Sequence, residues 1–493
     1  MGIYRLPNQG RRRLPRRETR QTMSESFDLT ILGGGPGGYV AAIRAAQLGL
    51  KVALVEKDSS LGGTCLHRGC IPTKALLHYT ETLEKLAHCA DFGLNVTVGS
   101  VDVPKMHAAK AKVVKKMAGG IDGLMKKNGI TVKTGRGRLV GPGQVQVGDE
   151  TLTSTRVLLA TGSKPATLPF LPPDGRRVFT SDEMLPHTEV PESLIVLGAG
   201  AVGLEFACIY KALGSQVQVV EMADRALPIE DEEISKEIQA AYKKRGIPIL
   251  CATRLASAQI ADDGVELQGE DLKTGQAVTL KAAAVLCAVG RLPVLEELGL
   301  EELGVEREGR YLKVDPQYRT NLWWLYAIGD IVPGPQLAHV ASAEGIVCVE
   351  TIAGHDTHPI DYGKIPSATY CRPEVASIGM SEAQAKEKGY DVKVGRFPWA
   401  ALGKAAILGE TEGLVKIVSE AKYGELLGVH IVGPHATDLI AEACVAISCE
   451  ATVEELFRTV HAHPTLPEGL MEAAHGVFGQ PIHLPPQRRA AAK

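Results

Sequence analysis

The sequence predicts an α/β protein that contains two copies of one βαβ unit and ends in a region of a different, α+β type. Residues 26–57 and 193–222 form the two copies. Each reads as an apolar strand, a glycine-rich turn, an Ala-rich helix and a second apolar strand closed by Glu. From about Gly363, short strands alternate with helices, which indicates an α+β domain. With 493 residues, the chain is long enough for several hydrophobic cores.

The composition indicates a globular protein without a strong overall electrostatic field. Hydrophobic residues make up 45% of the chain and charged residues 23%, which is typical of folded proteins. The formal net charge of −3 favours neither a nucleic acid nor an anionic membrane as a partner. No apolar run approaches the roughly 20 residues of a membrane-spanning helix. We therefore expect no nucleic-acid and no membrane partner.

The cysteine pattern favours a reducing compartment, and we expect a cytoplasmic protein. Most of the ten cysteines lie inside apolar stretches, where buried, reduced thiols are usual. Cys444 and Cys449 lie five residues apart in an amphipathic helix pattern, which predicts burial rather than chemistry. The cysteines of this core type include Cys208, Cys251, Cys287, Cys348 and Cys444.

The first 23 residues contain seven arginines and one acidic residue, too polar a composition for a core. We expect a disordered basic extension, or upstream translation before a second start at Met23. An Arg-rich organelle leader is the alternative, and it would place the protein in the mitochondrial matrix.

The glycines of the first βαβ unit predict a dinucleotide site. Gly33, Gly35 and Gly38 follow a strand and open a helix, so the backbone can approach a pyrophosphate that faces the helix N-terminus. Glu56 follows Gly33 by 23 residues, at the end of the next strand. Its carboxylate can accept hydrogen bonds from a ribose.

The second unit repeats this spacing. Gly198, Gly200 and Gly203 are followed by Glu221, again 23 residues after the first glycine. An acid here favours an unphosphorylated ribose, and therefore NAD over NADP, although Arg225 nearby weakens this preference. One such match is a weak signal, but two in the same register indicate two Rossmann-like domains.

Two dinucleotide sites in one chain imply a tightly bound flavin in one and an exchanging nicotinamide in the other. The segment NLWWLYAIGD at residues 321–330 supports this interpretation, because Asp330 can offer a carboxylate to the polar side chain of a flavin. The alternative for Asp330 is a helix N-cap or turn residue.

The segment GGTCLHRGCIPTKALL at residues 62–77 predicts a redox-active cysteine pair. Zinc would require C-x-x-C and two further ligands nearby, which are missing. Cys65 and Cys70 are separated by Gly69 in an irregular first helical turn, which suits a disulfide that opens and closes. The helix N-terminus and Lys74 would stabilise a thiolate at Cys70. A static disulfide is the alternative, but it is rare in a reducing compartment.

The chain resembles the flavoprotein pyridine nucleotide-disulfide oxidoreductases, and among them most closely the dihydrolipoamide dehydrogenases. The resemblance extends from about Phe27 to Gly476, and its most specific parts are the cysteine motif and HAHPTLPE. The phrases that carry it are GGGPGGYVAAIRAAQLG, GGTCLHRGCIPTK, LLATGSKP, GAGAVGLE, AVGRLP, YAIGD, GPQLAHVASAEG and HAHPTLPE.

HAHPTLPE supplies an acid–base pair, His463 and Glu468. A dithiol must lose a proton before it attacks a disulfide, and the ordinary pKa of histidine suits that task. Glu468 would orient the ring and support its cationic form. His461 is a rival by residue type, but the family pattern places the base directly before Pro-Thr.

The resemblance implies that the first domain holds FAD, that the second holds NAD, that a small central domain completes the flavin site, and that the C-terminal domain forms the interface of a homodimer. The expected divisions are the extension at 1–23 and domains at 24–168, 169–292, 293–362 and 363–493. FAD-site residues are Gly33, Gly35, Gly38, Glu56, Lys74, Thr161, Gly162, Asp330 and Ala338. NAD-site residues are Gly198, Gly200, Gly203, Glu205, Glu221 and Gly290, with Lys74 paired to Glu205.

The implied reaction begins when His463 deprotonates dihydrolipoamide and the substrate thiolate attacks Cys65 of the disulfide. Cys70 is left as a thiolate against the flavin, which passes hydride to NAD+. His463 and Glu468 of one subunit are expected to face Cys65 and Cys70 of the other. The implied partners are lipoyl domains of 2-oxoacid dehydrogenase or glycine cleavage complexes.

Glutathione, trypanothione and mercuric reductases are alternatives, as is a non-catalytic partner-binding subunit. A glutathione-type enzyme would carry basic residues near Glu221, and a mercuric reductase would end in adjacent cysteines. A non-catalytic subunit would have lost Cys70 or His463.

Two departures from the family pattern are His67 and Arg68, where many relatives carry Asn and Val and where added positive charge can tune the cysteine potential. A third is Val340, where many relatives carry Lys.

Overall fold

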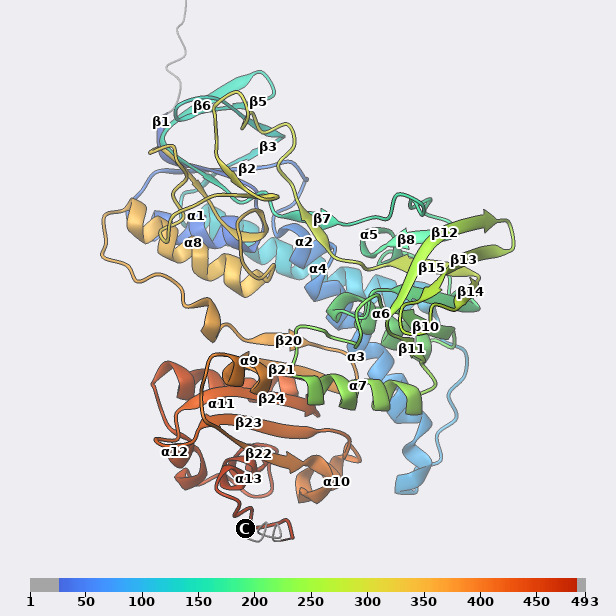
Figure 1. The fold of residues 1–493 in the computed structure, drawn as a ribbon. Coiled ribbons are helices and arrows are strands. Elements are labelled where there is room, and N and C mark those ends of the chain that lie inside the picture. Colours follow the sequence, from blue (N-terminus) through green and yellow to red (C-terminus); the bar gives the residue numbers. More distant parts are fainter. Residues whose placement is uncertain (1–25, 486–493) are drawn as a thin grey trace, which may run out of the picture.

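The computed structural model describes residues 26–485 and divides them into two α/β units and one α+β unit (Figure 1). The two α/β units lie side by side, and the C-terminal unit lies below both of them. The basic extension predicted at residues 1–23 lies outside the described residues.

The first unit is built on a sheet in which β3, β2, β1 and β6 run parallel in that order, and β5 and β4 continue the sheet in antiparallel pairing. The buried apolar run of β2 explains its central position. The strands are β1 (Ser26–Leu32), β2 (Val52–Glu56), β3 (Thr131–Thr134), β4 (Gly137–Gly141), β5 (Gln144–Val147) and β6 (Glu150–Leu159). The helices are α1 (Pro36–Gln47), α2 (Gly63–His67), α3 (Cys70–Ala87) and α4 (Val103–Lys127).

The predicted central segment, residues 293–362, joins this first unit. Its strand β19 (Leu325–Ala327) is fully buried and pairs with β6 in parallel, and its helix α8 packs against α1. A strand without exposed residues requires neighbours on both faces, which the first unit supplies. The segment also contains β17 (Arg307–Glu308), β18 (Tyr311–Leu312) and α8 (Ala338–Ile352).

The second unit has a five-stranded parallel sheet in the order β11-β10-β9-β15-β8, with a three-stranded antiparallel sheet beside it. Strands β7 (Ser163–Pro165) and β16 (Arg291–Pro293) pair between the two units. The parallel strands are β8 (Val178–Thr180), β9 (Ser193–Leu197), β10 (Gln216–Val220), β11 (Ile249–Leu250) and β15 (Ala284–Cys287). The smaller sheet contains β12 (Thr253–Ala261), β13 (Gly264–Asp271) and β14 (Ala277–Ala282), and the helices are α5 (Ser181–Met184), α6 (Ala201–Ala212) and α7 (Glu232–Lys244).

The C-terminal unit confirms the predicted α+β pattern. Its antiparallel sheet has the order β20-β21-β24-β23-β22, and helices cover it. The strands are β20 (Ser367–Thr369), β21 (Glu374–Gly379), β22 (Val392–Pro398), β23 (Leu414–Glu420) and β24 (Leu426–Gly433). The helices are α9 (Glu382–Glu387), α10 (Gly403–Leu408), α11 (Ala436–Ser448), α12 (Val453–Arg458) and α13 (Glu468–Val477).

The cysteines follow the predicted burial only in part. Cys208, Cys287 and Cys348 are buried, as expected. Cys444 is half-buried, and the prediction for Cys449 is wrong because this residue is exposed at the C-terminal end of α11. Within residues 26–485, no helix is long and apolar enough to cross a membrane.

Candidate active site

The first glycine of each dinucleotide motif is required by the backbone. Gly33 and Gly198 have φ values of +106° and +100°, in the region that favours glycine. A Cβ atom would lie 2.2 Å from the carbonyl oxygen of Ala160 at Gly33, and 2.4 Å from that of Ala288 at Gly198. Each glycine therefore permits a tight turn against the neighbouring strand.

The third glycine of each motif is required by packing. A Cβ atom at Gly38 would lie 1.8 Å from the carbonyl oxygen of Gly33, and one at Gly203 would lie 1.9 Å from that of Gly198. Because this position has no side chain, the first turn of α1 or α6 packs directly on the loop before it. The two units thus use their glycines in the same way.

The second glycine of each motif has no such requirement. Gly35 and Gly200 have ordinary φ values of −70° and −81°. A Cβ atom at Gly35 would meet nothing closer than the Cα of Gly63 at 3.9 Å, and one at Gly200 would meet no atom within 4 Å. Both residues immediately precede a helix, where backbone N–H groups attract anions. The space left by the missing side chains therefore fits the pyrophosphate of a dinucleotide.

The two acidic residues at the strand ends hold the glycine loops. Each carboxylate accepts two backbone N–H groups, one from the residue after the first glycine and one from two residues beyond the acid. The distances are 2.6 Å from Gly34 and 2.8 Å from Asp58 to Glu56, and 2.7 Å from Ala199 and 2.8 Å from Ala223 to Glu221. Sequence reasoning missed this role. The ribose contacts of both acids remain predictions.

Arg225, the residue that weakened the preference for NAD, is held by its own loop. Its guanidinium donates to the carbonyl oxygen of Pro228 at 2.9 Å and lies 3.6 Å from the carboxylate of Asp224. The positive charge beside Glu221 is therefore partly compensated.

The two predicted redox cysteines lie together at the junction of two helices. Cys65 lies in α2, and Cys70 is the first residue of the 18-residue helix α3. Both are half-buried free thiols, which is the reduced form of such a pair. The Cys65 thiol hydrogen-bonds to the Cys70 sulfur.

This contact shifts the pKa values of the two thiols in opposite directions. The hydrogen bond from Cys65, the Lys74 ammonium and the helix N-terminal amide lower the pKa of Cys70 to about 7, although burial opposes them. The same hydrogen bond, together with burial, raises the pKa of Cys65. The helix N-terminus and Lys74 therefore favour a thiolate at Cys70, and the separate roles of the two sulfurs remain predictions.

Lys74 lies one turn beyond Cys70 and forms the ion pair that the resemblance implied. Its ammonium lies 2.8 Å and 2.7 Å from the two carboxylate oxygens of Glu205, which is only 4% exposed. It also lies 4.6 Å from the ring centroid of Tyr370, whose backbone N–H donates to Glu205 at 3.1 Å. Sequence reasoning missed Tyr370, which belongs to the C-terminal unit.

Asp330 does not cap a helix but lies in the single turn of the short helix η2 (Gly329–Ile331), so the N-cap alternative is wrong and the turn alternative is confirmed. Ile328, which precedes this helix, is its N-cap, and no side chain caps that end. The Asp330 carboxylate instead accepts the hydroxyl of Ser163, which also receives Nε of Arg291 at 2.7 Å. Sequence reasoning missed Ser163 and Arg291, and their pairing depends on the contact between β7 and β16.

Three of the remaining predicted cofactor residues, Thr161, Gly162 and Gly290, directly flank that strand pair in the sequence. The hydroxyl of Thr161 donates to the carbonyl oxygen of Val294 at 2.7 Å. Gly162 and Gly290 have φ values of +71° and +123°, and a Cβ atom at either would meet nothing within 4 Å. Ala338 is the first residue of α8. Their contacts with a cofactor remain predictions.

His463 and Glu468 form the predicted pair in the C-terminal unit. Nδ1 of His463 donates to Glu468 at 2.9 Å, while the imidazole is 79% exposed. Burial would raise the pKa of Glu468, but the amide of Thr465 and the His463 ring outweigh it and hold the pKa below its usual range. The carboxylate thus remains charged and orients the ring.

The rival histidine has a structural role. Nε2 of His461 lies 2.8 Å from Glu442, Nδ1 lies 2.8 Å from the carbonyl oxygen of Thr459, and the side chain is 6% exposed. Both ring nitrogens are therefore engaged, whereas His463 presents an exposed edge.

The cysteines and the histidine pair lie far apart within one chain. Helix α2, with Cys65, belongs to the first unit, whereas α13 begins at Glu468 at the opposite end of the molecule (Figure 1). One chain alone does not bring His463 to Cys65.

Comparison with known families agrees with this geometry. Residues 27–345 match the family described as pyridine nucleotide-disulphide oxidoreductase, and residues 365–474 match the dimerisation domain of the same family. The chain belongs to this family. The match to the dimerisation domain supports a homodimer.

Relatives within the family cover nearly the whole chain. A dihydrolipoyl dehydrogenase of Bacillus subtilis is 44% identical over 94% of this chain and 100% of its own length. A mitochondrial dihydrolipoyl dehydrogenase of Arabidopsis thaliana is 43% identical over 94% and 92%. The crystal structure of LpdA from Mycobacterium tuberculosis superposes with a TM-score of 0.84 at 29% identity, covering 91% of this chain and 98% of that one.

The departures from the family pattern beside the cysteines have local partners. Arg68 donates to Asp58 at 2.8 Å, with Asp182 at 3.9 Å, so its charge faces two carboxylates. Nε2 of His67 lies 2.8 Å from the carbonyl oxygen of Leu61. Val340 is 1% exposed inside α8 and contributes to the core.

Proposed function

We propose that this chain is a dihydrolipoyl dehydrogenase that uses FAD and NAD and oxidises dihydrolipoamide carried on a partner protein. The cysteine pair is the observation that carries the proposal, since Cys65 and Cys70 lie together at the junction of α2 and α3, where Lys74 and the helix N-terminus can stabilise a leaving thiolate at Cys70. The relatives named dihydrolipoyl dehydrogenase support this substrate over glutathione or mercuric ions.

The cysteines perform the exchange step. With Cys65 and Cys70 oxidised to a disulfide, a substrate thiolate attacks Cys65, the bond between the two cysteines breaks, and Cys70 leaves as a thiolate. The second substrate thiolate then attacks the substrate sulfur bound to Cys65, which forms the cyclic disulfide and releases Cys65. The low pKa of Cys70 makes it the better leaving group.

His463 of a second subunit is the proposed base. Its Nδ1 is held by Glu468, so Nε2 is free to accept the protons of the substrate thiols. The charged Glu468 carboxylate stabilises the imidazolium that forms. This arrangement requires two chains, in agreement with the match to the dimerisation domain.

The chain holds its cofactors with the residues described above. Gly35 and Gly200 leave space for the two pyrophosphates. Asp330, Thr161, Gly162 and Ala338 surround the proposed flavin site, and Glu221 is placed to select NAD over NADP. FAD, when bound, accepts an electron pair from the dithiol and passes it as hydride to NAD+.

Lipoyl domains of 2-oxoacid dehydrogenase or glycine cleavage complexes are the proposed carriers of the substrate. We place the protein in the cytoplasm, with the mitochondrial matrix as the alternative if residues 1–23 act as a leader. The relatives include bacterial and mitochondrial proteins.

Steady-state kinetics tests the function. Purified protein is assayed with dihydrolipoamide and NAD+, and in parallel with oxidised glutathione and NADPH. Rapid formation of NADH in the first assay and no turnover in the second are expected. Faster turnover of glutathione than of dihydrolipoamide would contradict the assignment.

A further inference from the structure

The exposed face of α4 carries a concentrated positive charge. Between Val103 and Lys127 the helix contains seven lysines and a single acidic residue, Asp122, in a chain whose net charge is −3. Lys110 is buried, and the other six are exposed: Lys105, Lys112, Lys115, Lys116, Lys126 and Lys127. We call these six residues the α4 lysine face.

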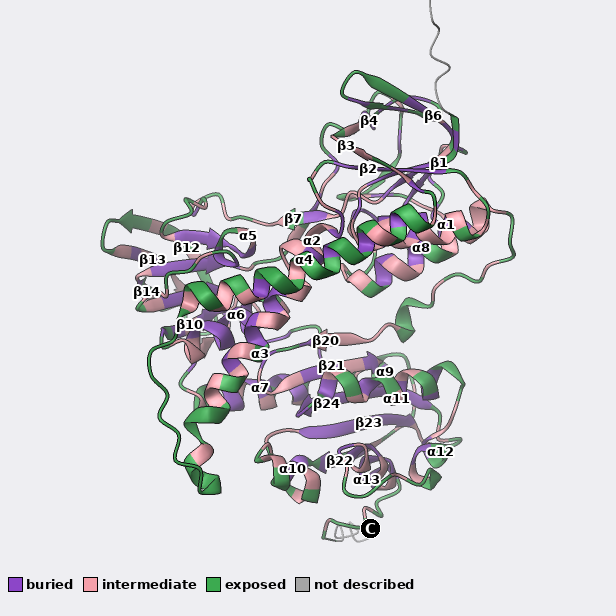
Figure 2. Ribbon diagram, turned by 180° about the vertical axis from the view of Figure 1, so that it is seen from behind, coloured by how far each residue is buried: buried purple, intermediate pink, exposed green. Residues whose placement is uncertain are grey.

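The six lysines share one side of the helix. At about 100° per residue they fall within roughly one third of the circumference. The opposite side carries Ala118, Ile121 and Met125, which are buried in a core cluster. Figure 2 shows α4 running across the surface of the molecule with exposed residues along most of its length.

Within the part of the chain that the structure describes, no carboxylate pairs with this face. No ion pair among residues 26–485 includes any of the six lysines, whereas some exposed lysines of the other two units have a carboxylate partner, such as Lys281 with Glu266 and Lys386 with Glu382. Lysines one turn apart, such as Lys112 and Lys116, repel each other and weaken the helix. A binding partner with negative charge would offset this repulsion.

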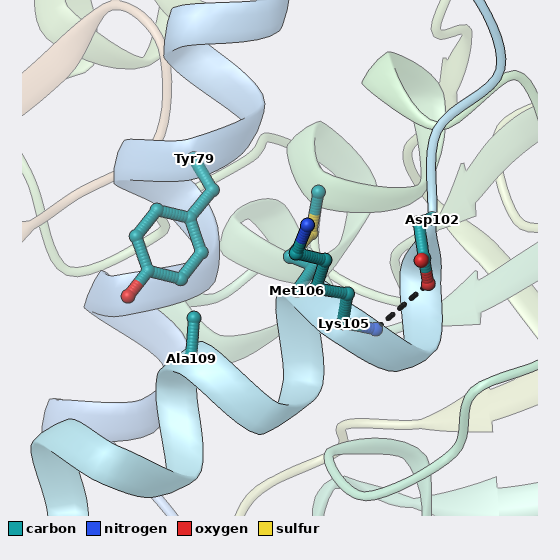
Figure 3. Close-up of a pocket in the computed structure, with 5 residues that line it drawn as sticks. All are labelled: Tyr79, Asp102, Lys105, Met106 and Ala109. Carbon is teal, nitrogen blue, oxygen red and sulfur yellow. Dashed lines mark hydrogen bonds between the residues drawn. The ribbon is translucent and has the colours of Figure 1, made fainter.

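A hollow adjoins the N-terminal end of the face. It has a volume of about 280 Å³ and lies between α3 and the first turns of α4 (Figure 3). Its lining is mainly apolar, from Tyr79, Met106 and Ala109, with Lys105 and Asp102 at its edge. The Asp102 side chain accepts the backbone N–H of Lys105 at 2.9 Å and so fixes the start of the helix. The hollow offers room for an apolar side chain of a docked protein.

The helix also lies beside the redox centre. Leu66, the residue after Cys65, shares a core cluster with Ala118, Ile121 and Met125 of α4, and α4 contacts both α2 and α3. A partner bound to the outer side of α4 is therefore separated from the redox loop by the thickness of one helix. Such a position suits a carrier that must bring a dithiol to Cys65.

We propose that the α4 lysine face, with the adjoining hollow, is a docking surface for an acidic protein domain that carries the dithiol substrate. The inference rests on the proposed function. Helix α4 contains neither arginine nor an aromatic residue, which nucleic-acid surfaces usually combine with lysine. Its outermost side also lacks the apolar residues that a membrane-surface helix buries in lipid. A cationic surface beside the redox loop would steer an acidic carrier and raise its association rate.

The test compares two forms of the substrate with two charge-reversal variants. The first variant replaces Lys112, Lys115 and Lys116 by Glu. The matched control replaces Lys243, Lys273 and Lys388 by Glu, since these are exposed lysines of other units without an ion pair among the described residues. Each protein is assayed with free dihydrolipoamide and with a reduced lipoyl domain of net negative charge, at low and at raised salt.

We expect the α4 variant to lose about tenfold in kcat/KM with the lipoyl domain at low salt and to lose the salt dependence of this rate. Its rate with free dihydrolipoamide and the rates of the control variant should equal those of the unsubstituted protein. Unchanged kinetics of the α4 variant with the lipoyl domain would overturn the inference. Binding of duplex DNA or phosphatidylserine vesicles that depends on the three lysines, with no effect on lipoyl-domain turnover, would also overturn it. Failure of the unsubstituted protein to oxidise free dihydrolipoamide would instead contradict the proposed function.

Discussion

The Lys74 ammonium lies 2.7 Å from the carboxylate of Glu205, and this ion pair joins the first unit to the second directly beside the redox cysteines. Lys74 lowers the pKa of Cys70, whereas Glu205 raises it. The two charges therefore act on the same sulfur in opposite directions.

Substitution of Lys74 and substitution of Glu205 should shift the pKa of Cys70 in opposite directions. Lys74→Met should raise the pKa of Cys70 and destabilise the fold by about 2 kcal/mol, because a buried carboxylate loses its cation. Glu205→Gln should lower the pKa. Thiolate absorbance titrated against pH, with denaturant unfolding in parallel, measures both effects. Shifts in the same direction would show that the pair does not set the Cys70 charge.

The thiolate itself should titrate near neutrality. The pKa of Cys70 is lowered to about 7, so the thiolate is present above this pH and is lost as the pH falls through it. In the reduced holoenzyme, the long-wavelength thiolate-to-flavin band should follow the same titration. Cys65→Ser should keep the band, and Cys70→Ser should abolish it. A band that survives only in Cys70→Ser would reverse the two roles.

Two glycine substitutions in the second motif should have different effects, one on NAD+ binding and the other on folding. Gly200→Ala meets no protein atom at an ordinary φ, so it should leave the free energy of unfolding unchanged within about 1 kcal/mol while raising KM for NAD+ about tenfold or more. Gly203→Ala would place Cβ 1.9 Å from a carbonyl oxygen and should destabilise the second unit. Thermal unfolding and NAD+ titration test the pair. An unchanged KM in Gly200→Ala would show that no pyrophosphate approaches there.

Nucleotide preference should depend on Glu221. The unsubstituted protein should use NAD+ with a kcat/KM at least about tenfold above that for NADP+, because a carboxylate repels a 2′-phosphate. Glu221→Gln should narrow this ratio. It should also cost about 1–3 kcal/mol, since the carboxylate accepts the backbone N–H groups of Ala199 and Ala223. Equal use of both nucleotides by the unsubstituted protein would show that Glu221 does not take part in ribose recognition.

Local sequence patterns were sufficient to predict the repeated units and the cysteine pair. Glycine spacing, strand hydrophobicity and the position of Lys74 relative to Cys70 all act over short segments, and the structure shows the two glycine loops with the same geometry. The pairing of Lys74 with Glu205 required the resemblance to a family, because the two residues are 131 positions apart.

The contacts that sequence reasoning missed come from tertiary packing. Arg291 reaches Ser163 only because β7 and β16 pair between units, and Tyr370 reaches Lys74 only because the C-terminal unit contacts the ion pair that joins the first two units. Cys449 illustrates the opposite error. Its helix pattern predicted burial, but the helix ends there and the side chain is exposed.

Mixing of two inactive variants tests whether the active site is shared between two subunits. Cys65→Ser and His463→Ala homodimers, each inactive towards dihydrolipoamide, are mixed under conditions of subunit exchange, and heterodimers are isolated with two different affinity tags. Each heterodimer combines an intact Cys65 with the intact His463 of its partner at one of its two sites. We predict recovery of about half the activity of the unsubstituted dimer. Verified heterodimers that remain inactive would contradict it.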